Sequence, residues 1–259
     1  MTKTALITGA SSGIGMALAR HHAERRGDLI LVARREDRLE ALKKELMDAH
    51  TVDVYTIAMD LAEPGAAEKL LAEVEARGLT VDYLINNAGF GGIAGFTDKP
   101  LEEWQGMIDL NISSLTAMCH TFLPHLVANG GGKVLNVSSV AGFMPGPYQA
   151  VYFASKAYVQ SFSQSLAGEF ADKGVTVTAL CPGPVKTEFG DVAGYSSKGF
   201  IKLALDPEEV ARQGYLGMLD GDLVTWDSLR WRLYQTFVRP FMPRRMEVEM
   251  IKQDHLKSL

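Results

Sequence analysis

Short apolar runs rich in β-branched residues alternate with amphipathic stretches up to residue 180. The runs lie at residues 5–8, 29–33, 54–58, 83–86, 133–137 and 176–180. Between them, residues 38–49 and 66–77 repeat apolar side chains at the spacing of one helix face. Strands that alternate with helices form a parallel sheet with helices on both faces. The pattern therefore predicts a three-layer α/β fold built on a doubly wound parallel sheet.

The regular alternation ends near Thr187. Residues 188–204 are rich in glycine and serine, which predicts a loop. Asp206 can cap a new helix, Pro207 fits its first position, and Glu209 completes a capping box. Because one α/β domain commonly reaches 259 residues, we expect a single domain over residues 1–259. Within it, we expect a loop and helix over residues 188–225 and a C-terminal helical extension over residues 226–259.

A glycine-rich turn directly follows the first predicted strand. It reads Gly9-Ala10-Ser11-Ser12-Gly13-Ile14-Gly15 and leads into a helical pattern. Glycines let a backbone approach a pyrophosphate, and the free amides of a helix N-terminus face its negative charge. No Gly-Lys-Ser or Gly-Lys-Thr follows, which counts against a nucleoside triphosphatase loop. The turn therefore predicts a dinucleotide site at the carboxyl ends of the strands.

Tyr152 and Lys156 lie four residues apart in a stretch of good helix formers, so both side chains fall on one helix face. Ser139 lies thirteen residues before Tyr152. A free tyrosine has a pKa of about 10, and a close cation in a poorly hydrated cleft lowers it. The spacing thus favours an acid/base group that works near neutral pH. A Tyr–Lys pair on a helix surface is the alternative interpretation.

Composition narrows the function classes. The net charge of −5 gives no footprint for nucleic acid. Cys119 and Cys181 both lie in apolar stretches, so we expect reduced core thiols rather than a disulfide or a metal site. No apolar run reaches the length that spans a membrane, and the chain starts directly with a strand-like run. We therefore expect a cytoplasmic protein without a signal peptide or a metal.

The glycine turn, Asn86-Asn87-Ala88-Gly89, Asn111, Ser139, Tyr152, Lys156 and Pro182-Gly183 occur in a familiar order and spacing. Together they resemble the short-chain dehydrogenase/reductase family over residues 2 to 190. The resemblance implies a Rossmann-type fold and reversible hydride transfer between a nicotinamide cofactor and a carbonyl or secondary alcohol. It also implies that the loop and helix over residues 188–225 cover the substrate.

The resemblance assigns a role to each catalytic residue. Tyr152 is the general acid in reduction and the base in oxidation, and Lys156 stabilises its phenolate and holds the nicotinamide ribose. Ser139 binds the substrate oxygen. The thirteen-residue offset to Tyr152 favours Ser139 over its neighbour Ser138. Asn111 resembles the asparagine that anchors a water beside the lysine; by itself it would be a polar residue on a helix surface.

The end of the second strand bears on the choice of cofactor. A carboxylate there would accept hydrogen bonds from a ribose 2′-hydroxyl and repel a 2′-phosphate. This chain has Ala33, followed by Arg34 and Arg35, and an arginine fork can hold a phosphate dianion. The two arginines are alternatively the solvated start of the next helix. Because the acid is missing, the sequence favours NADP(H) over NAD(H).

The resemblance also implies a set of cofactor contacts. They comprise Gly9, Ser11, Ser12, Gly13, Ile14 and Gly15 in the glycine turn, Arg34, Asp60, Leu61, Asn87, Ala88 and Gly89 after the next three strands, and Tyr152, Lys156, Pro182, Gly183, Val185 and Thr187. Val185 and Thr187 correspond to the residues that reach the nicotinamide carboxamide.

The C-terminal extension mixes aromatic and apolar residues with arginine. Residues 223–259 carry seven Lys or Arg and four Asp or Glu residues. The extension is either a helical segment packed on the substrate side or against another subunit, a lid over an apolar pocket, or a basic amphipathic surface on a membrane. It resembles the ending of long-chain 3-oxoacyl reductases, which favours a lipophilic carbonyl substrate.

Two other functions compete with a ketone reductase. Some members of the family bind the dinucleotide without turnover as sensors or scaffolds, but those typically lose the Tyr, Lys or Ser that this chain keeps. A polyol or steroid alcohol dehydrogenase that uses NAD is disfavoured by Ala33 and Arg34. The family usually forms tetramers through two long helices, here the one after Asn111 and the one that bears Tyr152, so we expect a homo-oligomer, either a dimer or a tetramer. Val159, Phe162 and Leu166 fit such an interface or the core of the subunit.

Overall fold

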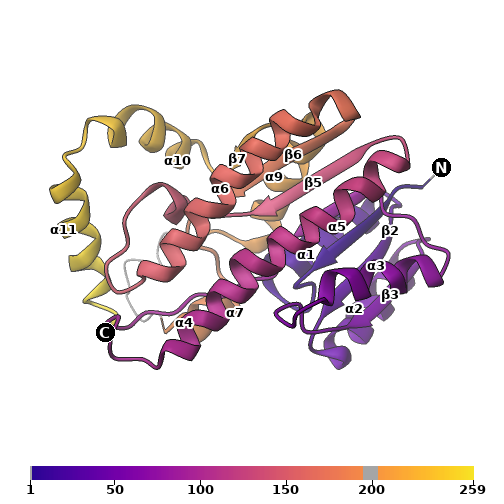
Figure 1. Cartoon of the computed structure of the whole chain (residues 1–259), viewed down its shortest axis with the longest axis horizontal. Coiled ribbons are helices and arrows are strands. Elements are labelled where there is room, and N and C mark those ends of the chain that lie inside the picture. Colours follow the sequence, from indigo (N-terminus) through magenta and orange to yellow (C-terminus); the bar gives the residue numbers. More distant parts are fainter. Residues whose placement is uncertain (1, 195–203) are drawn as a thin grey trace.

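The computed structural model describes residues 2–194 and 204–259. Within them, seven parallel strands form one sheet in the order β3-β2-β1-β4-β5-β6-β7. Figure 1 shows the whole chain, with β2, β3, β5, β6 and β7 of this sheet labelled. The strands are β1 (Thr4–Thr8), β2 (Asp28–Ala33), β3 (Val54–Ala58), β4 (Tyr83–Asn86), β5 (Gly132–Val137), β6 (Val175–Cys181) and β7 (Val224–Trp226). The order changes direction between β1 and β4, and this is where α/β sheets open a crevice for a ligand.

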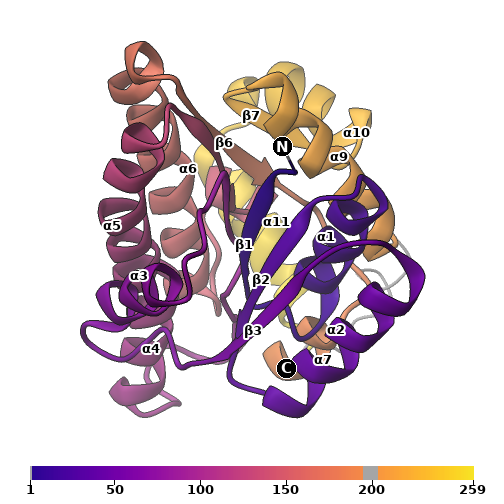
Figure 2. The same cartoon turned by 90° about the vertical axis from the view of Figure 1, so that its right-hand side faces the viewer.

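The strands are apolar on both faces because helices cover both. Along β1, Ala5 and Ile7 pack into one core cluster while Leu6 packs into the other. The first cluster holds α1 (Gly13–Glu24), α2 (Glu36–Ala49) and α9 (Pro207–Asp220). The second holds α3 (Ala66–Ala76), α5 (Leu115–Ala128) and α6 (Ala150–Phe170). Figure 2 shows these two helix layers on opposite sides of the sheet. The predicted doubly wound three-layer fold is confirmed.

All six predicted strands are present, and both predicted helices lie within α2 and α3 to within two residues. The predicted start of α9 is also present, since the Asp206 side chain accepts a hydrogen bond from the Glu208 amide and Pro207 is the first helical residue. The second half of the capping box is wrong. Glu209 turns its carboxylate to Arg212 and Gln213, whose charged and amide donors compete with the backbone amide.

The last strand was not predicted. β7 pairs with β6 through three residues, from Val224 to Trp226, so the sheet continues to the point where the C-terminal extension was expected to begin. Three residues are too few to display an alternating pattern. In the predicted loop, Glu188–Ala193 forms the short helix α7, while the stretch with Ser196, Ser197 and Gly199 lies outside the described residues.

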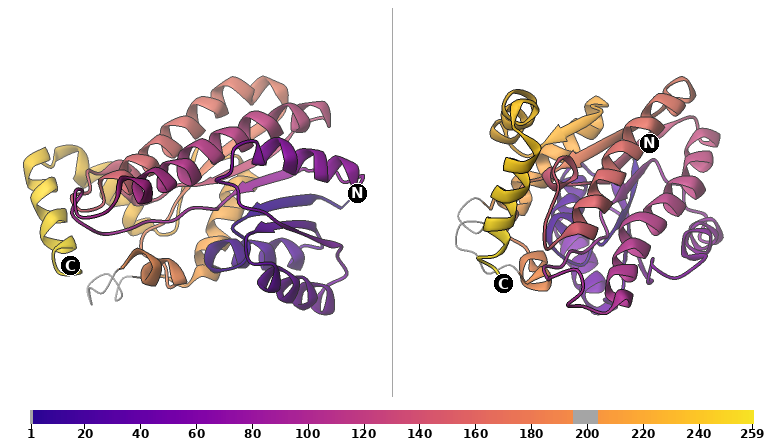
Figure 3. Two further views of the ribbon diagram at one scale, coloured as in Figure 1. Left: turned by 60° about the horizontal axis from the view of Figure 1, so that its bottom comes forward. Right: turned by 60° about the vertical axis from the view of Figure 1, so that its left-hand side comes forward.

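The C-terminal extension consists of α10 (Leu229–Leu233), the π-helical turn η4 (Tyr234–Val238), the 3-10 turn η5 (Arg239–Phe241) and α11 (Arg244–His255). Figure 1 and the left view of Figure 3 show it at the end of the molecule away from the N-terminus. The Glu247 carboxylate is 1% exposed and pairs with Arg239 at 3.0 Å and Arg244 at 2.9 Å. A buried carboxylate needs such partners. These pairs therefore fix the turn that leads into α11.

Several smaller expectations concern the interior. Cys119 and Cys181 are free and buried, and burial raises the pKa of each thiol to about 12. Val159 and Leu166 are buried in the core between α6 and the sheet, whereas Phe162 is only partly buried against it. Val159 and Leu166 thus belong to the core of the subunit, and a role of Phe162 in an interface stays a prediction. Among the described helices, none has the length and apolar character needed to cross a membrane.

Candidate functional site

A cleft of about 880 Å³ lies where the strands end. Its walls come from the segments that follow β1, β2, β3, β4, β5 and β6, together with α7 and the C-terminal extension. Every residue predicted for the site lines this cleft except Gly15 and Asn111. The sequence therefore located the cleft correctly, although the role of each residue stays a prediction.

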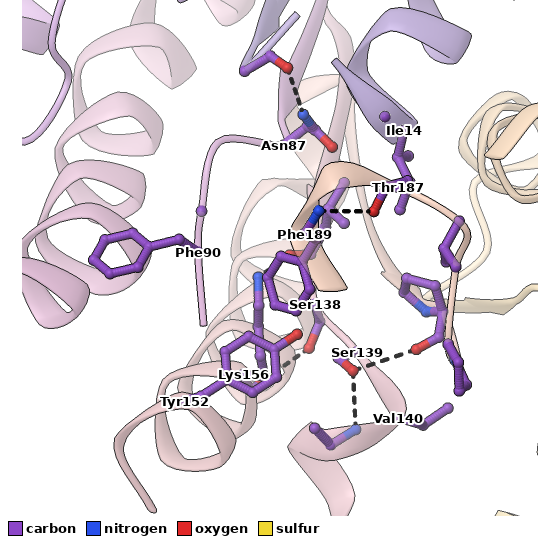
Figure 4. A pocket seen from close by; sticks show the side chains of 18 of the residues that line it. Ile14, Asn87, Phe90, Ser138, Ser139, Val140, Tyr152, Lys156, Thr187 and Phe189 are labelled. Atoms are coloured by element: carbon purple, nitrogen blue, oxygen red, sulfur yellow. Dashed lines mark hydrogen bonds between the residues drawn. The ribbon is translucent and has the colours of Figure 1, made fainter. Parts of the chain in front are cut away.

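The glycine turn adopts the backbone that its residues predict. Gly9 and Gly13 have φ values of +64° and +54°, in the left-handed region that favours glycine. Gly15 packs directly on the carbonyl of Gly9 and on the Asn87 amide, so a methyl group there would overlap both. Asn87 in turn donates hydrogen bonds from Nδ2 to the carbonyls of Thr8 at 2.9 Å and Gly9 at 3.2 Å (Figure 4). Gly15 thus supports the cradle from beneath instead of lining it.

Two arginines follow β2, and they differ in what they contact. Arg34 is largely exposed, with Nη1 at 3.8 Å from the Asp60 carboxylate. Arg35 reaches the glycine turn, where its Nε and Nη2 each lie 3.3 Å from the Ser11 hydroxyl. Both line the cleft beside Ala33. Arg35 was not in the predicted contact set, because adjacent positions differ in side-chain direction and the sequence alone does not show which one turns inward.

Tyr152, Lys156 and Ser139 meet at the other end of the cleft (Figure 4). Helix α6 carries Tyr152 and Lys156 one turn apart, and Ser139 is the second residue after β5. The Ser139 hydroxyl accepts a hydrogen bond from the Ala141 amide at 3.1 Å, and its one proton can be directed either to the Pro182 carbonyl at 3.3 Å or to Tyr152. The Ser138 hydroxyl instead donates to the backbone carbonyl of Lys156 at 2.8 Å. This geometry agrees with the choice of Ser139 over Ser138.

The pKa of Tyr152 moves in the direction opposite to the one predicted. Burial raises it to about 12, and a hydrogen bond with the Ser139 hydroxyl offsets part of that rise. The Lys156 ammonium donates to the Val137 carbonyl at 2.8 Å and lies 5.8 Å from the centroid of the Tyr152 ring. The same burial lowers the pKa of Lys156 to about 8. Desolvation therefore dominates both groups, which a four-residue spacing does not reveal.

Asn111 lies in a π-helical turn, η1 (Asp109–Ser114), which follows α4 (Leu101–Ile108). Its side chain is buried, which excludes the alternative of a helix-surface residue. The Oδ1 atom accepts from the Phe90 amide at 3.1 Å, and Nδ2 donates to the Phe90 carbonyl at 2.9 Å and to Ser155 Oγ at 3.1 Å. Asn111 thus ties the segment after β4 to helix α6. Its predicted contact with a water stays a prediction.

The turn after β6 has a partner that sequence reasoning missed. Asp227, just after β7, is buried and accepts a hydrogen bond from the Gly183 amide at 2.6 Å. The indole of Trp231 packs on the same glycine so closely that a methyl group there would overlap it. Asp227 lies 44 positions after Gly183, so no local sequence pattern predicts this contact.

The C-terminal extension forms the outer wall of the cleft beside Tyr152. It contributes Arg230, Trp231, Tyr234, Met250, Ile251, Asp254, His255 and Lys257 to the lining. Ile251 shares a core cluster with Tyr152 and Phe153, and the His255 ring donates from Nδ1 to the Pro147 carbonyl at 2.6 Å. The extension is therefore packed on the side of the cleft that holds Tyr152. Within the described residues, no group of His, Cys, Asp and Glu side chains is arranged to hold a metal.

The chain is similar to several known proteins. Residues 3–194 match the family model described as short chain dehydrogenase. Sulfoacetaldehyde reductase 2 of Chromohalobacter salexigens is 40% identical over 219 residues, which cover 82% of this chain and 86% of that protein.

Two solved structures also match. A short-chain dehydrogenase from Sphingobium yanoikuyae in complex with NADPH has a TM-score of 0.82 and 33% identity, and the match covers 93% of this chain and 94% of that one. A bulky-bulky ketone specific alcohol dehydrogenase from Comamonas testosteroni has a TM-score of 0.77 and 27% identity, and the match covers 99% of this chain and 94% of that one.

Proposed function

Because the chain belongs to the short-chain dehydrogenase/reductase family, we propose that it reduces a lipophilic ketone or 3-oxoacyl-like carbonyl with NADPH, reversibly, and that Tyr152 is its general acid. It is an oxidoreductase that acts on CH–OH or C=O groups with a nicotinamide dinucleotide. The observation that carries the proposal is one cleft with the glycine turn at one end and Tyr152, Ser139 and Lys156 at the other. Cytoplasmic location and assembly into a homo-oligomer stay predictions.

The residues of the cleft fit a dinucleotide. Gly9 and Gly13 carry no side chains of their own at the start of α1, where backbone amides can meet a pyrophosphate. A side chain at Gly89 would stand between Asn111 and Lys156, at 3.0 Å and 3.5 Å, so the glycine keeps that part of the cleft open. The guanidinium groups of Arg34 and Arg35 border the cleft where an adenosine 2′-phosphate would be recognised.

The bound dinucleotide supplies the hydride, and the protein supplies orientation and the proton. With its pKa raised to about 12, Tyr152 keeps its proton at neutral pH and can donate it to the carbonyl oxygen. The Ser139 hydroxyl sits beside that phenol and positions the same oxygen. The Lys156 ammonium, fixed by the Val137 carbonyl, balances the negative charge that develops on the phenol as the proton leaves.

We expect the rate of reduction to depend on the charge of Lys156. Its pKa is lowered to about 8, so the group is an ammonium below that pH and a neutral amine above it. The value of kcat/KM for ketone reduction should stay level up to pH 8 and fall about tenfold per pH unit above it. Lys156→Arg keeps its charge at high pH and should lose this fall, even with a lower plateau. A wild-type profile that is level up to about pH 10 contradicts this role.

Substrate chemistry follows from the wall around Tyr152. Phe90, Met144, Phe153 and Phe189 contribute apolar surface from the body of the protein, and Trp231, Tyr234, Met250 and Ile251 contribute it from the extension. Phe189 lies against the Tyr152 ring, with centroids 5.4 Å apart. A wall of this kind favours a substrate with apolar groups beside its carbonyl.

A series of 2-alkanones tests the substrate class. Each methylene that enters the apolar wall should raise kcat/KM by about two- to fourfold until the wall is filled. Met250→Ala should weaken this rise for the longest ketones. Met246→Ala is the matched control, because Met246 lies one turn earlier on α11, is similarly exposed and does not line the cleft. If a small anionic aldehyde such as sulfoacetaldehyde is the better substrate, the lipophilic assignment is wrong and Arg230 and Lys257 become the groups to examine.

A further inference from the structure

Thr187 and Glu188, at the start of helix α7, form a strap across the dinucleotide cleft. Thr187 packs its methyl group against Gly13, close enough that a Cβ on this glycine would lie 3.0 Å from it. The next residue, Glu188, reaches the opposite side and pairs with Arg35, with Oε2 at 3.0 Å from Nη1. Its other oxygen, Oε1, lies 3.9 Å from Nη2 of Arg38. The strap therefore joins the segment after β6 to the segment after β2.

Glu188 also lies between two cavities. It lines the main cleft and a second cavity of about 590 Å³ on the far side of the strap. Arg20, Arg38 and Lys186 border that second cavity, so the carboxylate sits in basic surroundings. Arg20 is paired with Glu45 and Glu208. Among the described residues, Glu188 is the carboxylate that pairs with Arg35 and Arg38.

The fork of Arg35 is divided between two partners. Its Nε and Nη2 face the Ser11 hydroxyl, and its Nη1 is taken by Glu188. A phosphate dianion prefers a guanidinium that presents two parallel donors. With Glu188 in place, such a dianion meets a neutralised guanidinium and a carboxylate of like charge beside it. The fit of a 2′-phosphate to Arg35 is thus opposed by this chain's own side chain.

We propose that Glu188 is a specificity-determining residue of the dinucleotide site, because its carboxylate competes with the cofactor's 2′-phosphate for Arg35. The inference rests on the proposed binding of NADP(H) and deepens it. Arg35 favours the phosphorylated dinucleotide, and Glu188 limits by how much. Removing the carboxylate should strengthen the binding of ligands that carry a 2′-phosphate. The binding of ligands without a 2′-phosphate should stay unchanged.

Two small ligands isolate this effect without any turnover. Adenosine 2′,5′-bisphosphate and adenosine 5′-monophosphate differ only in the 2′-phosphate, and calorimetry gives the Kd of each at one fixed, moderate salt concentration. Glu188→Gln should tighten the bisphosphate by about 3- to 10-fold, as expected for one partly exposed charge pair, and change the monophosphate by less than about twofold. In an Arg35→Ala background, the same substitution should have a clearly smaller effect, because only the direct repulsion between the Glu188 carboxylate and the phosphate is then left to remove.

Glu208→Gln is the matched control. Glu208 is a similarly exposed carboxylate that borders the second cavity and pairs with Arg20 at 3.1 Å, away from Arg35. This variant should leave the ratio of the Kd for the monophosphate to the Kd for the bisphosphate unchanged. If Glu188→Gln also leaves the ratio unchanged, the competition does not exist.

The outcome also separates this inference from the proposed cofactor preference. A wild-type protein that binds both ligands equally overturns the preference for NADP(H). If Glu188→Gln then raises the ratio, the competition is real although the preference is not. A wild-type protein that prefers the bisphosphate, with no change in Glu188→Gln, keeps the preference and overturns the role of Glu188.

Discussion

Tyr152→Phe should lower kcat for ketone reduction by about 10²- to 10⁴-fold, because it removes the proposed proton donor. The ring itself remains, so its contacts with Phe153 and Phe189 persist. The Kd for NADPH should change by less than about threefold, because the substitution removes a neutral hydroxyl and no charged contact with the dinucleotide. Steady-state kinetics and fluorescence titration measure the two effects separately.

The matched control for this variant is Tyr158→Phe. Tyr158 lies on the same helix, and its hydroxyl pairs with Thr116 at 2.9 Å outside the cleft. It should keep nearly full activity. A Tyr152→Phe protein that retains more than about a tenth of the wild-type kcat removes Tyr152 as the general acid. The same experiment decides against a non-catalytic sensor if the wild-type protein turns over.

Ala33→Asp should reverse the preference between the two nicotinamide cofactors. Ala33 ends β2 and lines the cleft beside Arg34 and Arg35. A carboxylate there accepts hydrogen bonds from the ribose 2′-hydroxyl and repels a 2′-phosphate. We expect NADPH to bind about 100-fold more weakly and NADH about tenfold more tightly, with each Kd measured by fluorescence. The size of these changes in Kd is that expected for one new carboxylate close to the 2′-position of the ribose, where little water screens its charge.

Ala33→Asn separates the charge from the change of shape. Its amide has nearly the size of the carboxylate but no charge, so it should weaken NADPH binding far less than Ala33→Asp. If both variants weaken NADPH equally, the discrimination comes from space and not from charge. If neither does, the 2′-phosphate is not recognised at this end of β2.

The fold was largely predictable because local and long-range preferences agree in its centre. The β-branched runs at β1, β2, β4, β5 and β6 are largely buried, and helices with one apolar side separate them, so pattern and packing require the same arrangement. The exceptions lie at the edge. β7 has three residues and one neighbour, and the predicted helical extension is divided into α10 and α11, with Pro240 and Pro243 in the segment between them.

The composition of the site was predictable, but its energetics were not. Glycine positions with positive φ, such as Gly9 and Gly13, leave a clear trace in the sequence because other residues are strained there. The pKa of Tyr152 leaves none. It depends on how completely β5, α6 and the extension exclude water, and the spacing to Lys156 shows only that an amine is near.

Contacts between distant segments were the other gap. Glu188 lies 153 positions from Arg35, and Asp227 lies 44 positions from Gly183. Each pair joins an ordinary charged residue to a backbone or side chain that only the finished fold brings close. The sequence therefore predicted the cleft residues that follow each strand, but not the contacts that join the segments after two different strands.

Transfer of a deuteride tests the central claim most directly. The wild-type protein is incubated with 2-octanone and NADPH that carries deuterium at the transferable position, and the product is analysed by mass spectrometry. Our account predicts a secondary alcohol with one deuterium on its carbinol carbon. An alcohol without deuterium, or unchanged ketone together with unchanged cofactor, would contradict it.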